Sequence, residues 1–272
     1  MSLVYDREKK EIYYDKHVNG KLLSFLYESK LGSYLLKIIV SPIFSKIIAY
    51  YYDSWISILK VKKNRNKYKS YNDYFSRKKE YTTINNKKNV LIAPADSKVL
   101  AYKINKDAKF SIKNHIYTIN ELLNDNVDTS YFNGNLFVFR LGKNDYHRFC
   151  NVDAGQTLSQ KSIKGELHTV SEYSYKYKVF ATNSRIVNLL RLENFGEAFY
   201  IEVGALTIGK IIDYNNKYFG KGDERGYFLY GGSSIVLILK NTVKVDYDIV
   251  FNSCKGIETK VKYGERIGVK YE

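Results

Sequence analysis

Short apolar segments separated by turn residues dominate the chain from about residue 90 onward. Val, Ile, Phe and Tyr are frequent in these segments, and such β-branched and aromatic residues favour strands. Many of the segments are separated by Asn, Gly or Asp, which are typical of turns. The pattern predicts strands over residues 89–93, 98–104, 135–141, 176–182, 197–213 and 234–240, and one helix over 118–126. We therefore expect an α+β fold, mainly an antiparallel β domain.

A different pattern occupies residues 21–60, where Leu, Ile, Phe and Tyr are interrupted by lysines. The apolar runs are far shorter than the roughly 20 residues that a membrane-spanning helix needs. Pro42 is expected to separate two helices. We interpret the segment as a helix pair lying in a membrane interface, and the alternative is an ordinary helical hairpin packed on the domain. The prediction is a helical, basic, membrane-associating arm over residues 1–80 and a β-rich catalytic domain over 81–272.

The charge balance adds an anionic partner to this picture. The chain has 44 Lys and Arg against 28 Asp and Glu, a formal net charge of +16, and six of the ten residues from Lys60 to Lys69 are basic. Such an excess suits nucleic acid or an anionic lipid surface. No helix-turn-helix, zinc-finger or RNA-binding signature is present, so we predict a lipid surface and no nucleic acid. The spacing of Cys150 and Cys254 predicts neither a disulfide scaffold nor a metal site.

The stretch FLYGGSSIVLIL, residues 228–239, raises a chemical question. Taken alone, it is typical of a tight hairpin turn in which Gly231 and Gly232 supply positive φ. A second interpretation notes that the hydroxyl of Ser233 directly follows the carbonyl of Gly232. In a strained turn that hydroxyl can attack the carbonyl and convert the amide into an ester.

Activation of a serine needs a base, and the chain has few candidates. His147 lies in NDYHRFCNVDAG and His168 in GELHTV. A lone histidine is more often structural, but only histidine exchanges protons near neutral pH without a large pKa shift. Asp96 follows a predicted strand in LIAPADSKVLAY. On local sequence it is a turn carboxylate; with a histidine and Ser233 it can form a serine-activating group.

Several motifs in order resemble the phosphatidylserine decarboxylase family. SYNDYFSRKKE looks like its F-N-D-F-F-x-R-K segment, APADSK its P-x-D-G strand exit, and NDYHRF its D-Y-H-R segment. IEVGALTIGKI is similar to V-G-A-x-x-V-G-S/K, and KGDERGYFLYGGSS closely resembles the K-G-x-E-x-G-x-F-x-x-G-S-T processing site. The resemblance runs from about residue 20 to 240.

The resemblance implies self-cleavage between Gly232 and Ser233. The products would be a β chain, residues 1–232, and an α chain, residues 233–272, held together as a heterodimer. Ser233 would become a pyruvoyl group, which takes the amine of phosphatidylserine as a Schiff base. Decarboxylation would then give phosphatidylethanolamine.

The sequence departs from the common family pattern in the Y-H-R-x-H motif, where Cys150 replaces the second histidine. A thiol is a weak base unless its pKa is lowered, so His147 or His168 would have to activate the serine. We favour Asp96–His147–Ser233, with His168 as the alternative base. Ser97 for glycine and Ser234 for threonine are mild changes.

Three functions follow from these observations. The first is a self-processing, pyruvoyl-dependent lyase that meets phosphatidylserine as a peripheral protein on the cytoplasmic face of the cell membrane. The second is an unprocessed membrane-binding homologue, catalytically impaired by Cys150. The third is a basic nucleic-acid-binding protein. The sequence sets no oligomeric state, and a higher oligomer stays open.

Overall fold

The computed structural model of the chain describes residues 2–15, 20–39, 73, 75–78, 83–106, 109–112, 115–126, 128–142, 144–170, 172–205, 211–229 and 233–271. Pro42, the basic run 60–69, and Gly231 and Gly232 of the predicted cleavage site lie outside the described residues.

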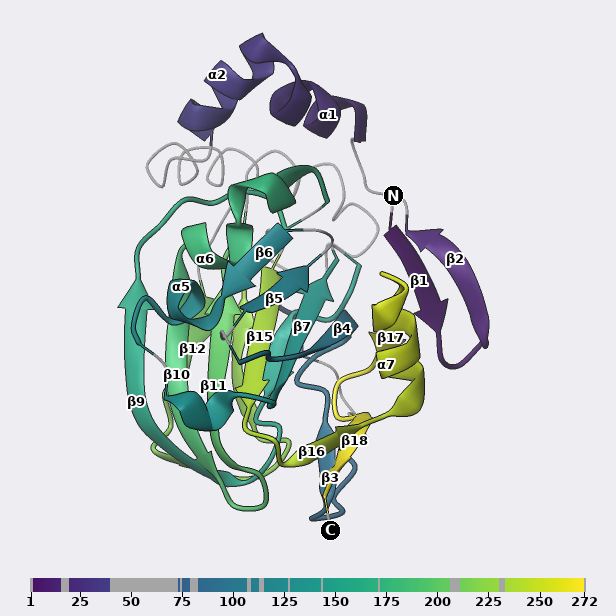
Figure 1. Cartoon of the computed structure of the whole chain (residues 1–272), viewed down its shortest axis with the longest axis vertical. Coiled ribbons are helices and arrows are strands. Elements are labelled where there is room, and N and C mark those ends of the chain that lie inside the picture. The colour runs from purple at the N-terminus through teal and green to yellow at the C-terminus, as the bar shows by residue number, and fades with distance from the viewer. Residues whose placement is uncertain are drawn as a thin grey trace.

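A ten-stranded sheet forms the centre of the molecule (Figure 1). β1 and β17 pair in parallel, and the other neighbouring pairs run antiparallel. This confirms the expected antiparallel β domain. In spatial order the strands are β13 (Tyr218–Phe219), β9 (Gly155–Ile163), β10 (Arg185–Leu192), β11 (Gly196–Val203), β15 (Ser233–Leu239), β7 (Asn135–Leu141), β4 (Ser97–Lys103), β17 (Glu258–Val261), β1 (Ser2–Asp6) and β2 (Glu11–Asp15).

Smaller sheets pack around this one. The first consists of β12 (Ile211–Asp213), β14 (Glu224–Phe228) and β8 (Arg148–Cys150). The second consists of β16 (Val243–Val245), β18 (Arg266–Lys270) and β3 (Val90–Ile92). β5 (Lys109–Ile112) and β6 (His115–Thr118) form a two-stranded ribbon.

The central strand β15 is buried on both faces. Alternate side chains point to opposite faces of a strand: Ile235 and Leu237 join one apolar cluster, whereas Val236 and Ile238 join the other. β7 divides its side chains between the same two clusters. A continuous run such as SIVLIL therefore suits a strand covered on both sides. The first residue of β15, Ser233, is held in the core of the molecule.

The strands on either side of the glycine pair belong to different sheets. β14 pairs with β8 and β12, whereas β15 pairs with β7 and β11. The hairpin interpretation of residues 228–239 is therefore wrong. The two strands of a hairpin pair with each other, and β14 and β15 do not. The chain instead passes from one sheet to another between Phe228 and Ser233.

The N-terminal region is only partly helical. Residues 2–15 form the β1–β2 hairpin at one edge of the large sheet, where β1 pairs with β17, although the sequence analysis placed them in a helical region. Two helices follow, α1 (Gly20–Glu28) and α2 (Lys30–Ile39), above one end of the β domain (Figure 1). They divide at Ser29, earlier than the expected break at Pro42. Neither these helices nor any other described one is long and apolar enough to cross a membrane.

Two further sequence expectations need correction. Residues 176–182 form the end of a 3-10 helix, η3 (Glu172–Tyr177), and the short helix α6 (Val179–Thr182), because Lys178 between them adopts a left-handed φ of 50° that ends any extended run. The predicted strand 197–213 is divided between β11 and β12, in different sheets.

The remaining helices are short and lie around the sheets. The helix expected at 118–126 is α5 (Ile119–Leu123), whose N-terminal cap is Thr118 in a reciprocal capping box with Glu121. The others are η2 (Thr129–Tyr131) and α7 (Tyr247–Cys254).

Candidate active site

Ser233 opens the central strand and is 1% exposed. Its neighbours in the sheet are Leu141 of β7 on one side and, one residue further on, Val203 of β11, which pairs with Ser234. The hydroxyl oxygens of Ser233 and Ser234 are buried and have no hydrogen-bond partner among the described residues. Leaving a buried polar group unpaired costs roughly 1–3 kcal/mol, and a catalytic role is one reason for which a native protein keeps such a group.

His147 lies on the β7 side of Ser233. The loop that follows Leu141 is fixed by Asp145, whose carboxylate accepts a hydrogen bond from the Gly142 amide and forms an ion pair with Lys98, both at 2.6 Å. The His147 carbonyl accepts a hydrogen bond from the Phe228 amide at 2.9 Å. The backbone of His147 is therefore tied to the end of β14, and the loop that carries it is tied to Gly142 after β7 and to Lys98 of β4.

The proton of the His147 ring is placed by its surroundings. Nδ1 lies 2.9 Å from the carbonyl oxygen of Asp145, and a carbonyl can only accept, so Nδ1 carries the hydrogen. Nε2 then holds a lone pair; it is buried and has no partner among the described residues. The ring packs against Phe75 with 3.8 Å between centroids and an interplanar angle of 34°.

Electrostatics keep this imidazole neutral. Burial lowers the pKa of His147 to about 3, and the nearby cations Arg77 and Lys98 act in the same direction. The Asp145 carbonyl opposes the shift only in part. At neutral pH the ring is therefore a free base whose accepting nitrogen is Nε2.

Asp96 lies on the segment between β3 and β4 that runs beside His147. Pro94 on this segment accepts a hydrogen bond from the Cys150 amide, and Lys98 reaches Asp145, so contacts on both sides of Asp96 meet the His147 segment. The Asp96 carboxylate accepts a hydrogen bond from the Tyr263 amide at 2.8 Å. His147 Nδ1 bonds to the Asp145 carbonyl, so the orienting role assigned to Asp96 stays a prediction.

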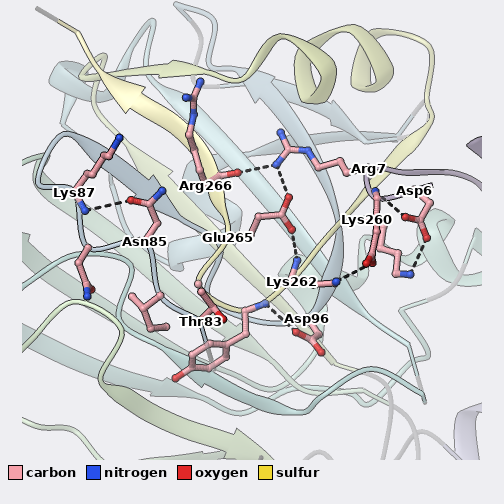
Figure 2. A pocket seen from close by; sticks show the side chains of 15 residues that line it. Asp6, Arg7, Thr83, Asn85, Lys87, Asp96, Lys260, Lys262, Glu265 and Arg266 are labelled. Atoms are coloured by element: carbon pink, nitrogen blue, oxygen red, sulfur yellow. Dashed lines mark hydrogen bonds and ion pairs between the residues drawn. The ribbon is translucent and has the colours of Figure 1, made fainter. Parts of the chain in front are cut away.

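Asp96 also lines a surface pocket of about 1080 Å³ (Figure 2). Three lysines contribute to its wall, and two of them form ion pairs: Lys260 with Asp6 at 2.8 Å and Lys262 with Glu8 at 2.7 Å. The pocket therefore has alternating charges in place of a basic surface.

His168 lies on the opposite side of Ser233, next to β11. The Asn183 side chain bridges its backbone to Gly204: Nδ2 donates to the carbonyls of both residues at 2.8 Å, and Oδ1 accepts from the His168 amide at 3.0 Å. Gly204 directly follows Val203, the partner of Ser234. Backbone hydrogen bonds thus link His147 to Phe228 of β14, and link His168 through Asn183 to Gly204, which follows β11.

Both ring nitrogens of His168 are occupied. Nε2 lies 2.7 Å from a carboxylate oxygen of Glu166, and Nδ1 lies 3.2 Å from the Tyr27 hydroxyl. The ring is stacked on Tyr177 at 4.6 Å. Burial lowers the pKa of His168, and the Glu166 carboxylate opposes this shift. His168 is held by its partners, whereas the Nε2 of His147 is left open.

Cys150 does not replace the missing histidine. Its side chain is buried, and the sulfur contacts the Ala93 carbonyl at 3.8 Å. Burial raises the pKa of the thiol to about 12, despite a hydrogen bond with Tyr263 that acts in the opposite direction. The thiol stays protonated at neutral pH and supplies no base.

The buried charged residues that form ion pairs with β14 were not predicted from the sequence. Arg225 lies between the carboxylates of Glu202 and Asp213, at 3.3 and 3.1 Å. Burial, with Asp213 nearby, raises the pKa of Glu202 well above its usual range. Gly226 also has a role here, because a Cβ at that position would lie 2.0 Å from the Ile212 carbonyl oxygen. The available signal was the group of charged residues in KGDERGYF.

Comparison with known proteins agrees with this arrangement. The phosphatidylserine decarboxylase family profile matches residues 71–269. The chain is 45% identical to phosphatidylserine decarboxylase proenzyme 2 of Clostridium acetobutylicum, covering 97% of each chain. It is 38% identical to the phosphatidylserine decarboxylase proenzyme of Clostridium tetani over 98% of each chain, and 36% identical to that of Clostridium beijerinckii over 99% of each. This chain therefore belongs to the phosphatidylserine decarboxylase family.

Proposed function

We propose that this chain is a phosphatidylserine decarboxylase proenzyme that cleaves itself between Gly232 and Ser233. The observation that carries the proposal is that the Ser233 hydroxyl and His147 Nε2 are both buried and without a hydrogen-bond partner among the described residues. Serine activation requires a nucleophile and a base that are available to each other.

In the proposed cleavage, His147 Nε2 removes the proton from the Ser233 hydroxyl as its oxygen attacks the Gly232 carbonyl. The Gly232 acyl group moves from the backbone nitrogen of Ser233 to its hydroxyl oxygen, so the amide becomes an ester. Loss of the Ser233 Cα proton and departure of the Gly232 carboxylate then break the Cβ–O bond. Hydrolysis of the resulting unsaturated amine releases ammonia and leaves a pyruvoyl group at the new N-terminus.

The surroundings of Ser233 fit such a group. Ser233 lies between two neighbouring strands in the interior, and its hydroxyl is unpaired among the described residues. A pyruvoyl carbonyl supplies an electrophile that bonds to the substrate amine and accepts electrons as the carboxylate leaves as carbon dioxide. His147 is then the base for Ser233, and His168, which already exchanges hydrogen bonds with Glu166, is the acid–base group for protonating the carbon.

A membrane surface is the proposed place of action, because the substrate is a lipid. On α2 the exposed side chains Leu31, Tyr34, Leu35 and Ile38 follow the i, i+3, i+4, i+7 spacing that puts them on one face. Leu31 and Tyr34 are 63% and 67% exposed. An apolar helix face next to a basic sequence suits binding to an anionic leaflet. We propose peripheral attachment at the cytoplasmic face of the cell membrane.

The first experiment is the intact mass of the purified protein under denaturing conditions, followed by carbon dioxide release from phosphatidylserine vesicles. Two chains that separate at Gly232–Ser233, with a small chain lacking a free amine, together with carbon dioxide release, support the proposal. Cleaved chains without release would refute the substrate assignment.

The inert thiol of Cys150 favours a second candidate, an unprocessed homologue that binds membranes without catalysis. A single chain at full mass that still binds anionic vesicles would support it. A Cys150→His variant that then cleaves would show that the missing histidine is the cause.

A further inference from the structure

Tyr27 is a buried contact between α1 and the β domain. It is fully buried, although Phe25 on the same helix is exposed. Its ring packs against the rings of His168 and Tyr177, with centroid distances of 5.8 and 5.6 Å. Its backbone carbonyl accepts a hydrogen bond from Lys176 at 2.6 Å. The helix is thus attached to the segment that surrounds His168.

The hydrogen bonds of the Tyr27 hydroxyl have a direction. The Thr169 amide can only donate, and it donates to the Tyr27 oxygen at 3.2 Å. The hydroxyl proton is then free to point to His168 Nδ1, also at 3.2 Å. In His168 the ring N–H proton is then on Nε2, which donates to Glu166 at 2.7 Å. Tyr27 and Glu166 together hold the ring from its two nitrogens.

The same helix is joined closely to the exposed face of α2. Only Ser29 separates the two helices; its amide donates to the Phe25 carbonyl at 3.1 Å, and its hydroxyl accepts from the Gly32 amide at 2.9 Å. A Cβ on Gly32 would lie 2.0 Å from that carbonyl oxygen, so the turn tolerates only glycine there. A force on α2 therefore reaches α1 through a short, hydrogen-bonded junction.

We propose that Tyr27 is a positioning residue for His168, through which the membrane-facing helices are coupled to the acid–base histidine. The inference rests on the proposed function, in which His168 protonates the carbon after carbon dioxide leaves. Attachment of α2 to a lipid surface keeps α1 in place, and Tyr27 in turn keeps His168 in the orientation that Glu166 requires.

Tyr27→Phe tests the proposal, because it removes the hydroxyl and keeps the ring. Tyr131→Phe is the matched control: Tyr131 is buried too, but its hydroxyl has no partner among the described residues. On phosphatidylserine vesicles we expect Tyr27→Phe to lower kcat about tenfold or more with little change in KM, since misplacement of a reacting group affects turnover. Tyr131→Phe should leave both constants unchanged, and both variants should still cleave.

A double-mutant cycle shows whether Tyr27 acts through His168. In a His168→Gln background, Tyr27→Phe should change kcat by less than about twofold. An equal loss of kcat with and without His168, or a loss no larger than that of Tyr131→Phe, would overturn the proposal.

Hydrogen exchange of the Thr169 amide separates this inference from the proposed function. In the uncleaved Ser233→Ala chain, Tyr27→Phe should raise the exchange rate of that amide, which loses its acceptor. Unchanged exchange refutes the contact, whether or not the enzyme is active. A wild-type chain that neither cleaves nor releases carbon dioxide would refute the proposed function, and the exchange result would still decide whether Tyr27 holds the His168 segment.

Discussion

The two predicted histidines, His147 and His168, carry their protons on opposite ring nitrogens. A backbone carbonyl holds Nδ1–H of His147, whereas Tyr27 and Glu166 favour Nε2–H in His168. His147 alone presents a nitrogen that has no partner among the described residues. The structure thus supports a division of labour in which His147 serves the serine and His168 a later proton transfer.

Substitution of each histidine should separate the two steps. His147→Ala is expected to leave the chain uncleaved, because Ser233 loses its base. His168→Gln, which keeps a donor for Glu166, is expected to cleave but to release carbon dioxide at least about tenfold more slowly, a loss of about 1.4 kcal/mol in transition-state stabilisation. Mass spectrometry and a carbon dioxide assay measure the two effects. Cleavage by His147→Ala at the wild-type rate would contradict the assignment.

The pH dependence of cleavage follows from the buried state of His147. Its pKa is lowered to about 3, so the neutral, accepting form persists as pH falls and is lost only near that value. We expect cleavage to keep its rate between about pH 8 and pH 5, where a histidine of ordinary pKa near 6.5 would lose most of its free base. Timed mass spectra of newly refolded protein test this. A half-maximal rate near pH 6.5 would indicate an exposed base instead.

The predicted role of Asp96 has its own test. Asp96→Asn keeps the size of the side chain and an acceptor for the Tyr263 amide but removes the charge. If the carboxylate supports His147, cleavage should slow by about tenfold or more. An unchanged rate would leave the Asp145 carbonyl as the only group needed to orient the ring.

At the scale of elements, Arg7 joins the N-terminal hairpin to the part of the chain that follows the cleavage site. Its guanidinium forms ion pairs with Asp248 at 2.6 Å, Glu265 at 3.0 Å and Asp246 at 3.1 Å. β1 also pairs with β17 from that part. The first residues of the large chain are therefore bound to the small one.

Removal of this contact should weaken the processed enzyme. Arg7→Ala is expected to lower the free energy of unfolding by about 1–3 kcal/mol, since three carboxylates lose a shared, partly buried cation. Lys9→Ala is the control, because its ion pair with Glu11 is long and exposed and should contribute almost nothing. Urea unfolding of the cleaved protein measures both. Equal midpoints for the two variants would contradict the role of Arg7.

The exposed face of α2 makes a separate prediction. Tyr34→Asp should weaken binding to phosphatidylserine vesicles by about tenfold or more, because a charge replaces apolar surface next to an anionic leaflet. Tyr247→Asp introduces the same charge at an exposed tyrosine of α7 and should change binding little. Vesicle sedimentation gives both affinities. Equal binding by both variants would place the membrane contact elsewhere.

At the scale of the whole molecule, the small chain is part of the sheet and not an appendage. Its first strand, β15, has β11 on one side and β7 on the other, and β17 and β18 join β4, β1 and β3. We expect the two chains to elute together under native conditions and to separate only when the sheet unfolds. Size exclusion across a urea series tests this, and dissociation well before loss of β-sheet circular dichroism would contradict it.

Much of this architecture could be predicted from local sequence. The strand at 135–141 has the predicted bounds, because five of its seven residues are apolar. The helix at 118–126 was shortened at both ends, by Thr118 as a cap and by left-handed Asn124. Sequence motifs predicted the cleavage-site residues and also His147 and His168. The residue types in these motifs already limit the chemistry that the site can perform.

Other features depend on contacts distant in sequence and could not be predicted. The pairing of β1 with β17 joins residues about 250 positions apart, and no local pattern records it. Val179 and Phe180 have strand-favouring side chains but serve as buried residues of a short helix, since their tertiary environment outweighs propensity. Tyr27 gave no signal, because its partners lie more than 140 residues away.

The crossing between β14 and β15 has a mechanical consequence. β14 before the proposed cut and β15 after it are paired in two separate sheets. Each new chain end is therefore still held by its own strand when the bond breaks. No strand has to be released, and the fold has no need to be rebuilt after the cut. Self-cleavage is then a single, local event that leaves the surrounding sheets in place. The free end that it creates is the one that carries the new carbonyl to the lipid substrate.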